Sequence, residues 1–284
     1  MDTTAPSREQ WIRVFEAMAK VKDLAPWQWM NEADLFGVQD PETSEVYYVS
    51  VMGELGEHFA VAAYPGAEGL NGFWTMNQGI LEQSPEVFVL VPQLQASFED
   101  RSTLSEQDRQ LIKALGYKFR GKQAWPLFRS YRPAYMPWYL EAAEATVLAL
   151  VLEQMLEVAP RFREDRQLLE LTSDGAYLVR VAGDVDGAVM WKDRRMTVTI
   201  PPPPSITIEM DARLLAYLKG LPRSKVQVEI DVAMLPSPVK ETDSRPFFPF
   251  IVVVAETRSG MILGHEMLDL RPGHSPLLTL RRRS

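Results

Sequence analysis

The sequence predicts an α+β protein in two parts, built from antiparallel sheets with packed helices. Amphipathic helical segments and short β-rich segments both recur along the 284 residues. Neighbouring β-rich segments are joined by short glycine-containing turns, which favours antiparallel hairpins. Four consecutive prolines, Pro201–Pro204, then interrupt the chain and indicate a division between two domains.

The composition is that of a globular protein with a substantial core. Hydrophobic residues make up 46% of the chain and charged residues 24%, unlike the balance of a disordered chain. The net charge of −8 disfavours nucleic acid and anionic membranes as partners. The chain contains no cysteine, which excludes disulfides, thiolate metal sites and cysteine nucleophiles.

We expect a cytoplasmic protein without a membrane partner. The N-terminal run MDTTAPSREQWIRVF has neither the basic nor the apolar region of a signal peptide. The most apolar window, residues 142–159, is interrupted by Glu144, Glu153 and Glu157. This window therefore predicts a buried helix rather than a membrane span.

Helices and hairpins are expected to alternate in the first part of the chain. Ser7 precedes a segment whose apolar residues share one helical face, so it is expected to cap a helix that extends to Lys22. The run LAPWQWM at 24–30 is typical of a turn, and residues 34–43 are typical of loops. Strands are predicted at 46–52, 58–64 and 86–93, and a helix at 67–82.

Two stronger helix signals follow in the middle of the chain. Ser105 is expected to cap a helix that ends at Gly116, with Asp108 in the position of a capping box. Residues 123–131 are expected to be extended. A long apolar helix is predicted at 139–158, and Pro160 is expected to help end it. Short strands are predicted at 168–171, 176–182, 187–192 and 196–200.

The tetraproline Pro201–Pro204 is the predicted domain boundary. Proline has no backbone N–H, and consecutive prolines form a stiff polyproline II spacer. We therefore expect an N-terminal α+β domain at 1–200 and a C-terminal domain at 205–284. Strands at 205–209, 225–234, 248–256 and 261–269 and a helix at 212–219 are predicted in the second domain.

Carboxylates in the second domain form a candidate metal site. Polar and apolar residues alternate in the run KVQVEIDV, so Glu229 and Asp231 share one face of a strand. Two such carboxylates can bind Mg²⁺ or Mn²⁺ through oxygen. Glu256 ends the next strand and would lie near Asp231 if the two strands pair antiparallel. The other interpretation is that all three side chains are solvated strand residues.

This strand and the hairpin that contains ETRSGMILG resemble the opening strands of ribonuclease H-like integrases and transposases. The resemblance covers residues 225–269 and implies an incomplete sheet of that type. It also implies that Asp231 and Glu256 would be catalytic residues of a metal-dependent phosphodiester cleavage. The later acidic residues of that family have no counterpart before Ser284, so we expect at most a decayed relative. Without that activity, no cofactor is predicted.

Two other features are candidate binding sites. One Pro-Trp pair is Pro26-Trp27, with Trp29 nearby, and the other is Pro137-Trp138, with Tyr135 nearby. Such clusters can line a groove for an extended peptide or a base. Large rings before a helix also pack against the core, which is the alternative.

The run GAEGLNG opens a predicted helix with Gly66 and Gly69, where either an anion binds or the chain makes a tight turn.

The order of the motifs LAPWQWM, AYPGAEGL and RPAYMPW resembles a family of bacterial proteins described as domains of unknown function. The resemblance covers residues 11–159, and the second half is similar to a companion domain. It implies no activity, and it implies a natural chain that extends beyond Ser284. We therefore predict a non-catalytic binding or interaction protein with an unknown protein or peptide partner. A metal-dependent nuclease-like domain centred on Asp231 is the alternative.

Overall fold

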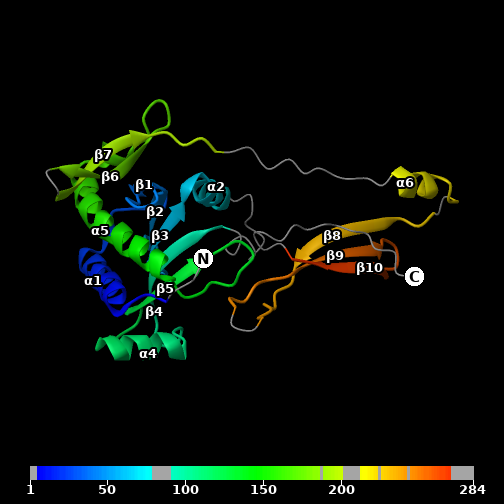
Figure 1. The fold of residues 1–284 in the computed structure, drawn as a ribbon, viewed down its shortest axis with the longest axis horizontal. Coiled ribbons are helices and arrows are strands. Elements are labelled where there is room, and N and C mark those ends of the chain that lie inside the picture. The colour runs from blue at the N-terminus through cyan, green and yellow to red at the C-terminus, as the bar shows by residue number, and fades with distance from the viewer. Residues whose placement is uncertain are drawn as a thin grey trace. The chain divides into compact units, whose positions relative to one another are not determined.

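The computed structural model describes residues 5–78, 91–185, 188–200, 212–222, 225–241 and 244–269. The chain divides into two compact units, Met1–Ile200 and Pro201–Ser284, which Figure 1 shows as ribbons. The first contains a seven-stranded sheet and the second a three-stranded sheet. The predicted α+β class is confirmed. The tetraproline lies outside the described residues, so its conformation stays a prediction.

The sheet of the first unit has the strand order β5-β4-β3-β2-β1-β6-β7. Neighbouring strands are antiparallel, except that β1 and β6 run parallel with Gly37 opposite Val179. The strands are β1 (Phe36–Gln39), β2 (Val46–Met52), β3 (Phe59–Pro65), β4 (Gln93–Glu99), β5 (Trp125–Tyr131), β6 (Tyr177–Val185) and β7 (Ala188–Met196).

Helices cover both faces of this sheet. Helices α1 and α5 pack on one face and α2 on the other. Because successive strand residues point to opposite faces, β2 sends Val49 toward α5 and Tyr48 toward α2. The helical elements of the unit are α1 (Arg8–Leu24), η1 (Pro26–Gln28), α2 (Gly66–Asn77), α4 (Glu106–Leu115), α5 (Ala142–Glu164) and η2 (Arg166–Leu169).

Helix α5 is apolar around most of its circumference, because the sheet covers one side and α1 another. Leu148 is fully buried, and burying such a side chain contributes about 2 kcal/mol. Polar contacts fix α1 on α5: Gln10 Nε2 donates to Ala142 O at 2.9 Å and Arg13 pairs with Glu153 at 2.6 Å. No helix within the described ranges is long and apolar enough to cross a bilayer.

The end of α5 differs from the prediction. Pro160 does not end the helix, which continues to Glu164. An internal proline removes one hydrogen bond and strains the preceding turn, at a cost of about 3 kcal/mol. Val158, Ala159 and Phe162 are buried in the core on either side of Pro160. Their burial offsets the cost of the proline.

The loop predicted at 34–43 contains a strand that the sequence did not indicate. Strand β1 lies between β2 and β6, and its Phe36 and Val38 are buried. The glycine inside it, Gly37, permits close packing, since a Cβ there would lie 2.9 Å from the side chains of Val179 and Val46. Gly37, which in the sequence is typical of a loop, is therefore required because β6 packs too closely for a side chain at this position.

Three other strand predictions in the first unit need correction. A strand was expected at 168–171, but the first two of these residues end the 3-10 turn η2, which begins after Asp165, whose side chain accepts from Gln167 N. The strand expected at 187–192 is longer, because β7 continues to Met196 and pairs along its length with β6. The separate strand expected at 196–200 is wrong, since residues 197–200 follow the end of β7 and are not in a strand. The strand expected at 86–93 falls largely outside the described residues, and β4 starts only at Gln93.

The second unit contains one described helix, α6 (Ala212–Lys219), and three strands in the order β10-β9-β8. All pairs are antiparallel. The strands are β8 (Val228–Met234), β9 (Phe250–Glu256) and β10 (Ile262–Leu268). The predicted helix at 212–219 and the last three predicted strands are confirmed, whereas the strand predicted at 205–209 lies outside the described residues.

Leu148→Ala tests whether the α5 contact holds the first unit together. Leu148 is fully buried, so the substitution leaves a cavity and is expected to lower the free energy of unfolding by about 3 kcal/mol. Urea denaturation followed by circular dichroism measures this change. Glu157→Ala, on the exposed side of the same helix, is the control and is expected to change stability by less than about 0.5 kcal/mol. Equal effects would contradict the assignment.

Candidate functional site

A cavity of about 340 Å³ lies between α1, α4 and β5 in the first unit. Ligand pockets for small molecules generally have volumes of about 300–1,000 Å³. Trp11 and Phe15 line the cavity from α1, and Leu111 and Ile112 line it from α4. Its remaining walls come from Phe128 of β5 and from the segment before α5. Most of its lining is therefore apolar.

An aromatic cluster centred on Phe15 places α4 beside α1. Gly116 ends α4 in the left-handed conformation at φ 83°, which a glycine adopts without strain. The chain then turns back, and the Tyr117 ring stacks on Phe15 at 5.0 Å between centroids. Phe128 of β5 meets the same ring edge-on at 5.0 Å. Phe15 of α1 and Phe128 of β5, which both line the cavity, therefore meet in this cluster.

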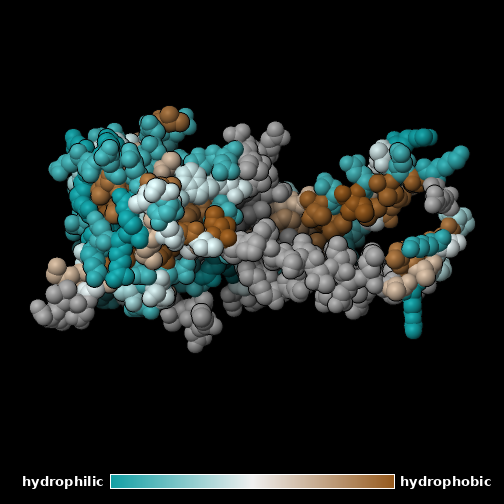
Figure 2. Space-filling model, turned by 90° about the horizontal axis from the view of Figure 1, so that it is seen from above, coloured by the Kyte–Doolittle hydropathy of each residue, from teal (hydrophilic) through white to brown (hydrophobic). Residues whose placement is uncertain are grey.

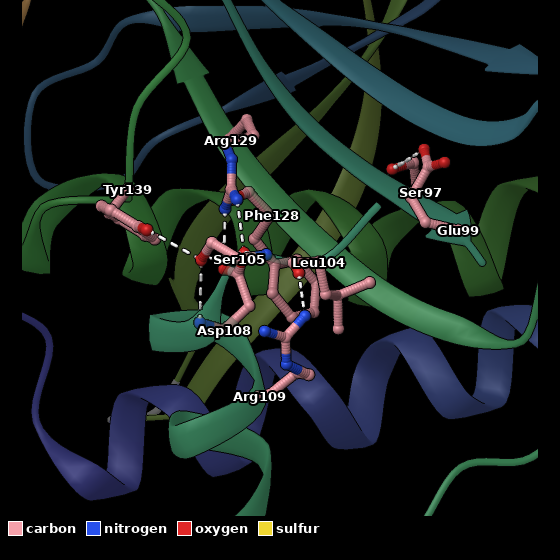
Figure 3. A network of polar contacts seen from close by, with 9 residues as sticks. All are labelled: Ser97, Glu99, Leu104, Ser105, Asp108, Arg109, Phe128, Arg129 and Tyr139. Carbon is pink, nitrogen blue, oxygen red and sulfur yellow. Dashed lines mark hydrogen bonds and ion pairs between the residues drawn. The ribbon is translucent and has the colours of Figure 1, made fainter. Parts of the chain in front are cut away.

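A polar network forms one end of the cavity and joins α4 to β5 (Figure 3). Arg129 donates to both carboxylate oxygens of Asp108, at 2.9 and 2.6 Å. Ser105, the N-cap of α4, donates from Oγ to Asp108 Oδ2 at 2.7 Å. The Tyr139 hydroxyl lies 2.9 Å from the Ser105 Oγ, and the Arg129 guanidinium lies 4.8 Å from the centre of the Tyr139 ring.

The charges of this network neutralise each other. Burial by itself would raise the pKa of Asp108, but hydrogen bonds from Arg129 and Ser105 outweigh it and hold the pKa below its ordinary value of 3.8. The side chains of Arg129 and Asp108 are only 17% and 9% exposed. A carboxylate with a lowered pKa is a weak base.

The structure separates the two predicted Pro-Trp pairs. Trp29 lies near the end of α5, where its Nε1 donates to Ala159 O at 3.0 Å. Trp138 lies before the start of α5, in an antiparallel bridge with Ser130. The helix between them, from 142 to 159, is about 25 Å long. The two pairs therefore do not form one groove.

The individual rings of these pairs contact the fold at several points. Trp27 packs on Phe59 with centroids 4.8 Å apart and is half-buried against the main core. Tyr135 is half-buried in the turn after β5, where its N–H donates to Arg132 O at 3.0 Å. Trp138 meets the ring of Tyr139 edge-on at 5.2 Å. Of the two regions, only the one around Trp138 adjoins a residue that lines the cavity.

Gly66 and Gly69 have structural reasons to be glycine. Gly66 begins α2 with φ 54°, and a side chain on it would collide with the Glu45 carboxylate. A Cβ on Gly69 would lie 2.8 Å from the carbonyl carbon of Tyr64, so the glycine permits α2 to pack tightly on the end of β3. These contacts favour the tight turn, and the anion site stays a prediction without a geometric feature that supports it.

The carboxylates of the second unit do not converge. The register pairs Asp231 with Val253 and Val228 with Glu256. Because directly paired residues share a face of the sheet, Glu256 points to the face opposite Glu229 and Asp231. Glu256 instead accepts from the N–H of Ser259 at 2.7 Å within the following turn. Across the described ranges, no group of three or more Asp, Glu or His is arranged to hold a metal.

Comparison with protein families assigns the chain to a family without describing an activity. Residues 11–180, more than half of the chain, match a family model described as a domain of unknown function (DUF7309). The chain belongs to the DUF7309 family. Residues 214–279 match a second domain of unknown function (DUF6930). No curated protein and no solved structure matches the chain.

The cavity lies entirely within the first unit, and most of its residues fall in the DUF7309 match. The sequence predicted the capping role of Ser105 and Asp108 but not the partner of Asp108. Arg129 is 21 residues away on a different element, and local spacing does not indicate such a pair. In the sequence, Arg129 is only an arginine in a predicted extended segment beside apolar residues. That pattern is too common to identify a site.

Asp108→Asn tests the network through its pH dependence. Removing the charge leaves Arg129 unpaired and is expected to cost about 3 kcal/mol of unfolding free energy at pH 7. Since the pKa of Asp108 is lowered in the folded state, its contribution is complete above about pH 5 and is lost as the pH falls below 3.8. Urea denaturation between pH 7 and 3 should therefore show the difference between wild type and variant shrinking with acid.

The control for this series is Glu106→Gln, which removes an exposed carboxylate one residue after the same N-cap. Its effect should stay below about 1 kcal/mol at all pH values. A difference between wild type and Asp108→Asn that does not change with pH would contradict the role given to the charge of Asp108.

Gly69→Ala tests the packing of α2 on β3. The added methyl would lie 2.8 Å from the Tyr64 backbone, so the helix must shift and stability is expected to fall by about 1–3 kcal/mol. Glu68→Ala, exposed on the same turn, is the control and should be nearly neutral. Thermal unfolding is measured with and without phosphate. A melting temperature raised by phosphate in wild type but not in Gly69→Ala would instead support the anion site.

Proposed function

We propose that the first unit is a non-catalytic binding domain. Its ligand site is the cavity between α1, α4 and β5, and its ligand is an uncharged apolar group, such as a large side chain presented by a partner protein or peptide. The observation that carries this proposal is an apolar cavity of about 340 Å³ whose polar end is already satisfied by its own ion pair.

The polar end favours an uncharged ligand. Arg129 uses two N–H groups on Asp108 and one on the carbonyl of Phe128. A charged ligand would have to separate this pair, and breaking a buried pair costs about 3–5 kcal/mol. An apolar ligand leaves the pair intact and gains free energy by leaving water. Tyr139 can still offer the edge of its ring and its hydroxyl to orient the ligand.

The rim of the cavity favours a side chain that enters from a partner surface. Gln107, Gln110 and Ala114 line the cavity and are exposed on α4, so the site is reached from solvent. Partner proteins often anchor themselves by inserting one aromatic side chain into such a pocket, surrounded by weaker polar contacts. The two glutamines can supply those contacts without a net charge.

Ala114→Trp tests the site by filling it from the rim. Ala114 is exposed, so the variant should fold normally while its indole occupies the cavity. The probe is N-acetyltryptophanamide, an uncharged mimic of one side chain, with binding followed by NMR chemical-shift changes. We expect affinity to fall at least about tenfold, which corresponds to about 1.4 kcal/mol. The charged analogue N-acetyltryptophan should bind wild type more weakly than the amide.

The matched control is Lys113→Trp, which adds the same ring one residue away on α4 and outside the cavity lining. It should bind the probe as wild type does. The proposal is wrong if wild type fails to bind the amide at millimolar concentration, or if the two tryptophan variants behave alike.

A further inference from the structure

The sheet of the second unit exposes an apolar face. The register pairs Ile230 with Val254 and Val232 with Val252, so these side chains lie on one face together with Val228. Val228, Ile230 and Val232 are 51%, 66% and 54% exposed. Figure 2 shows hydrophobic side chains gathered over this sheet. We call this surface the β8–β9 apolar face and define it as Val228, Ile230, Val232, Val252 and Val254.

The alternation along β8 identifies this face as the one that should be buried. Glu229 and Asp231 point to the other face of the same strand. An antiparallel sheet commonly packs one face on a core and presents the other to water. In the second unit the polar side of β8 is solvated as expected, but its apolar side is exposed as well. A row of exposed β-branched side chains indicates a surface that is covered by another element.

Helix α6 has a matching exposed apolar side. Tyr217, Leu218 and Leu221 are 55%, 51% and 44% exposed. Tyr217 and Leu218 are adjacent near the end of α6, and Leu221 follows two residues after the helix ends at Lys219, so these exposed apolar side chains gather at the C-terminal end of α6. A helix stabilises itself in water chiefly by burying such a side. The β8–β9 apolar face and the apolar side of α6 would therefore both gain stability from being buried away from water.

We infer that the β8–β9 apolar face is the docking surface of α6 from the same chain. Both belong to one compact unit. The second family match, residues 214–279, begins inside α6 and covers most of it together with all three strands, which indicates that helix and sheet recur together. Packing one helix on one sheet face gives the two-layer arrangement by which small α+β domains bury a core.

The connection between the two elements permits this docking. Residues 220–227 link α6 to β8 and can span roughly 27 Å when extended. The helix has eight residues and is about 12 Å long. The chain can therefore turn back after Lys219 and lay α6 across the strands. A short tether also raises the effective concentration of the helix at the face to the millimolar range.

Charges at the margin of the face are complementary to those of the helix. α6 carries two cations, Arg213 and Lys219, and no carboxylate. Glu266 is paired with Val252, and Glu256 with Val228, so both carboxylates lie on the face that α6 would cover. Opposite charges around an apolar contact favour one orientation of the partner over others. If a second copy of the sheet covered this face instead, carboxylates of the two copies would approach each other and repel.

Disulfide trapping tests the inference, because the chain has no cysteine of its own. The variant Leu218→Cys with Ile230→Cys places one thiol on the apolar side of α6 and one in the apolar face. The matched control is Leu218→Cys with Asp231→Cys, one residue along β8 on the opposite face. All three positions are exposed, so folding is unaffected. Full-length protein is oxidised at low concentration, and mass spectrometry identifies the linked peptides.

A disulfide requires the two Cα atoms to approach within about 7 Å. We expect the 218–230 pair to form within one chain at least about tenfold faster than the 218–231 pair. Equal rates would show random collision of a tethered helix and would overturn the inference. Linkage mainly between chains would show that a second copy covers the face, and absence of both products would show that α6 does not reach it. Either result also overturns the inference.

Discussion

The contact of α5 with the seven-stranded sheet is the constraint on which the first unit depends. The helix is surrounded by apolar side chains from α1 and from four strands, so its burial aligns these elements with each other. It also accounts for a charge inside the unit: Arg180 of β6 donates from Nε to Gln154 of α5 at 3.0 Å. That arginine is paired with Asp193 of β7 at 2.6 Å, so even the edge strand is tied to the helix.

The cavity is a consequence of the same packing. Helix α1 is held by α5 through Gln10 and Arg13, which fixes Trp11 and Phe15 as one wall. Strand β5 is fixed by its ladder with β4. Helix α4 completes the enclosure through the aromatic cluster and the Asp108–Arg129 pair. The same pair therefore lines one end of the cavity and joins α4 to β5.

The two units satisfy the need for a buried core to different degrees. The first covers both faces of its sheet with helices, and the charged side chains buried among its described residues are few and are held by hydrogen bonds or ion pairs. The described part of the second contains a three-stranded sheet, and a sheet of this size is stable only when a further layer covers its apolar face. That requirement is the strongest physical feature of the described part of the second unit, and the inferred docking of α6 would meet it.

The sequence by itself determined the elements whose signals are local. The Ser7 and Ser105 caps, the apolar pattern of α5 and the hairpins of both sheets follow from neighbouring residues, and so did the family resemblance. The tertiary structure decided what depends on distant partners: the strand around Gly37, the continuation of α5 past Pro160, the separation of the two Pro-Trp pairs, the face on which Glu256 lies and the pairing of Asp108 with Arg129. Register and packing bring together residues far apart in the chain, and local propensity carries no information about that choice.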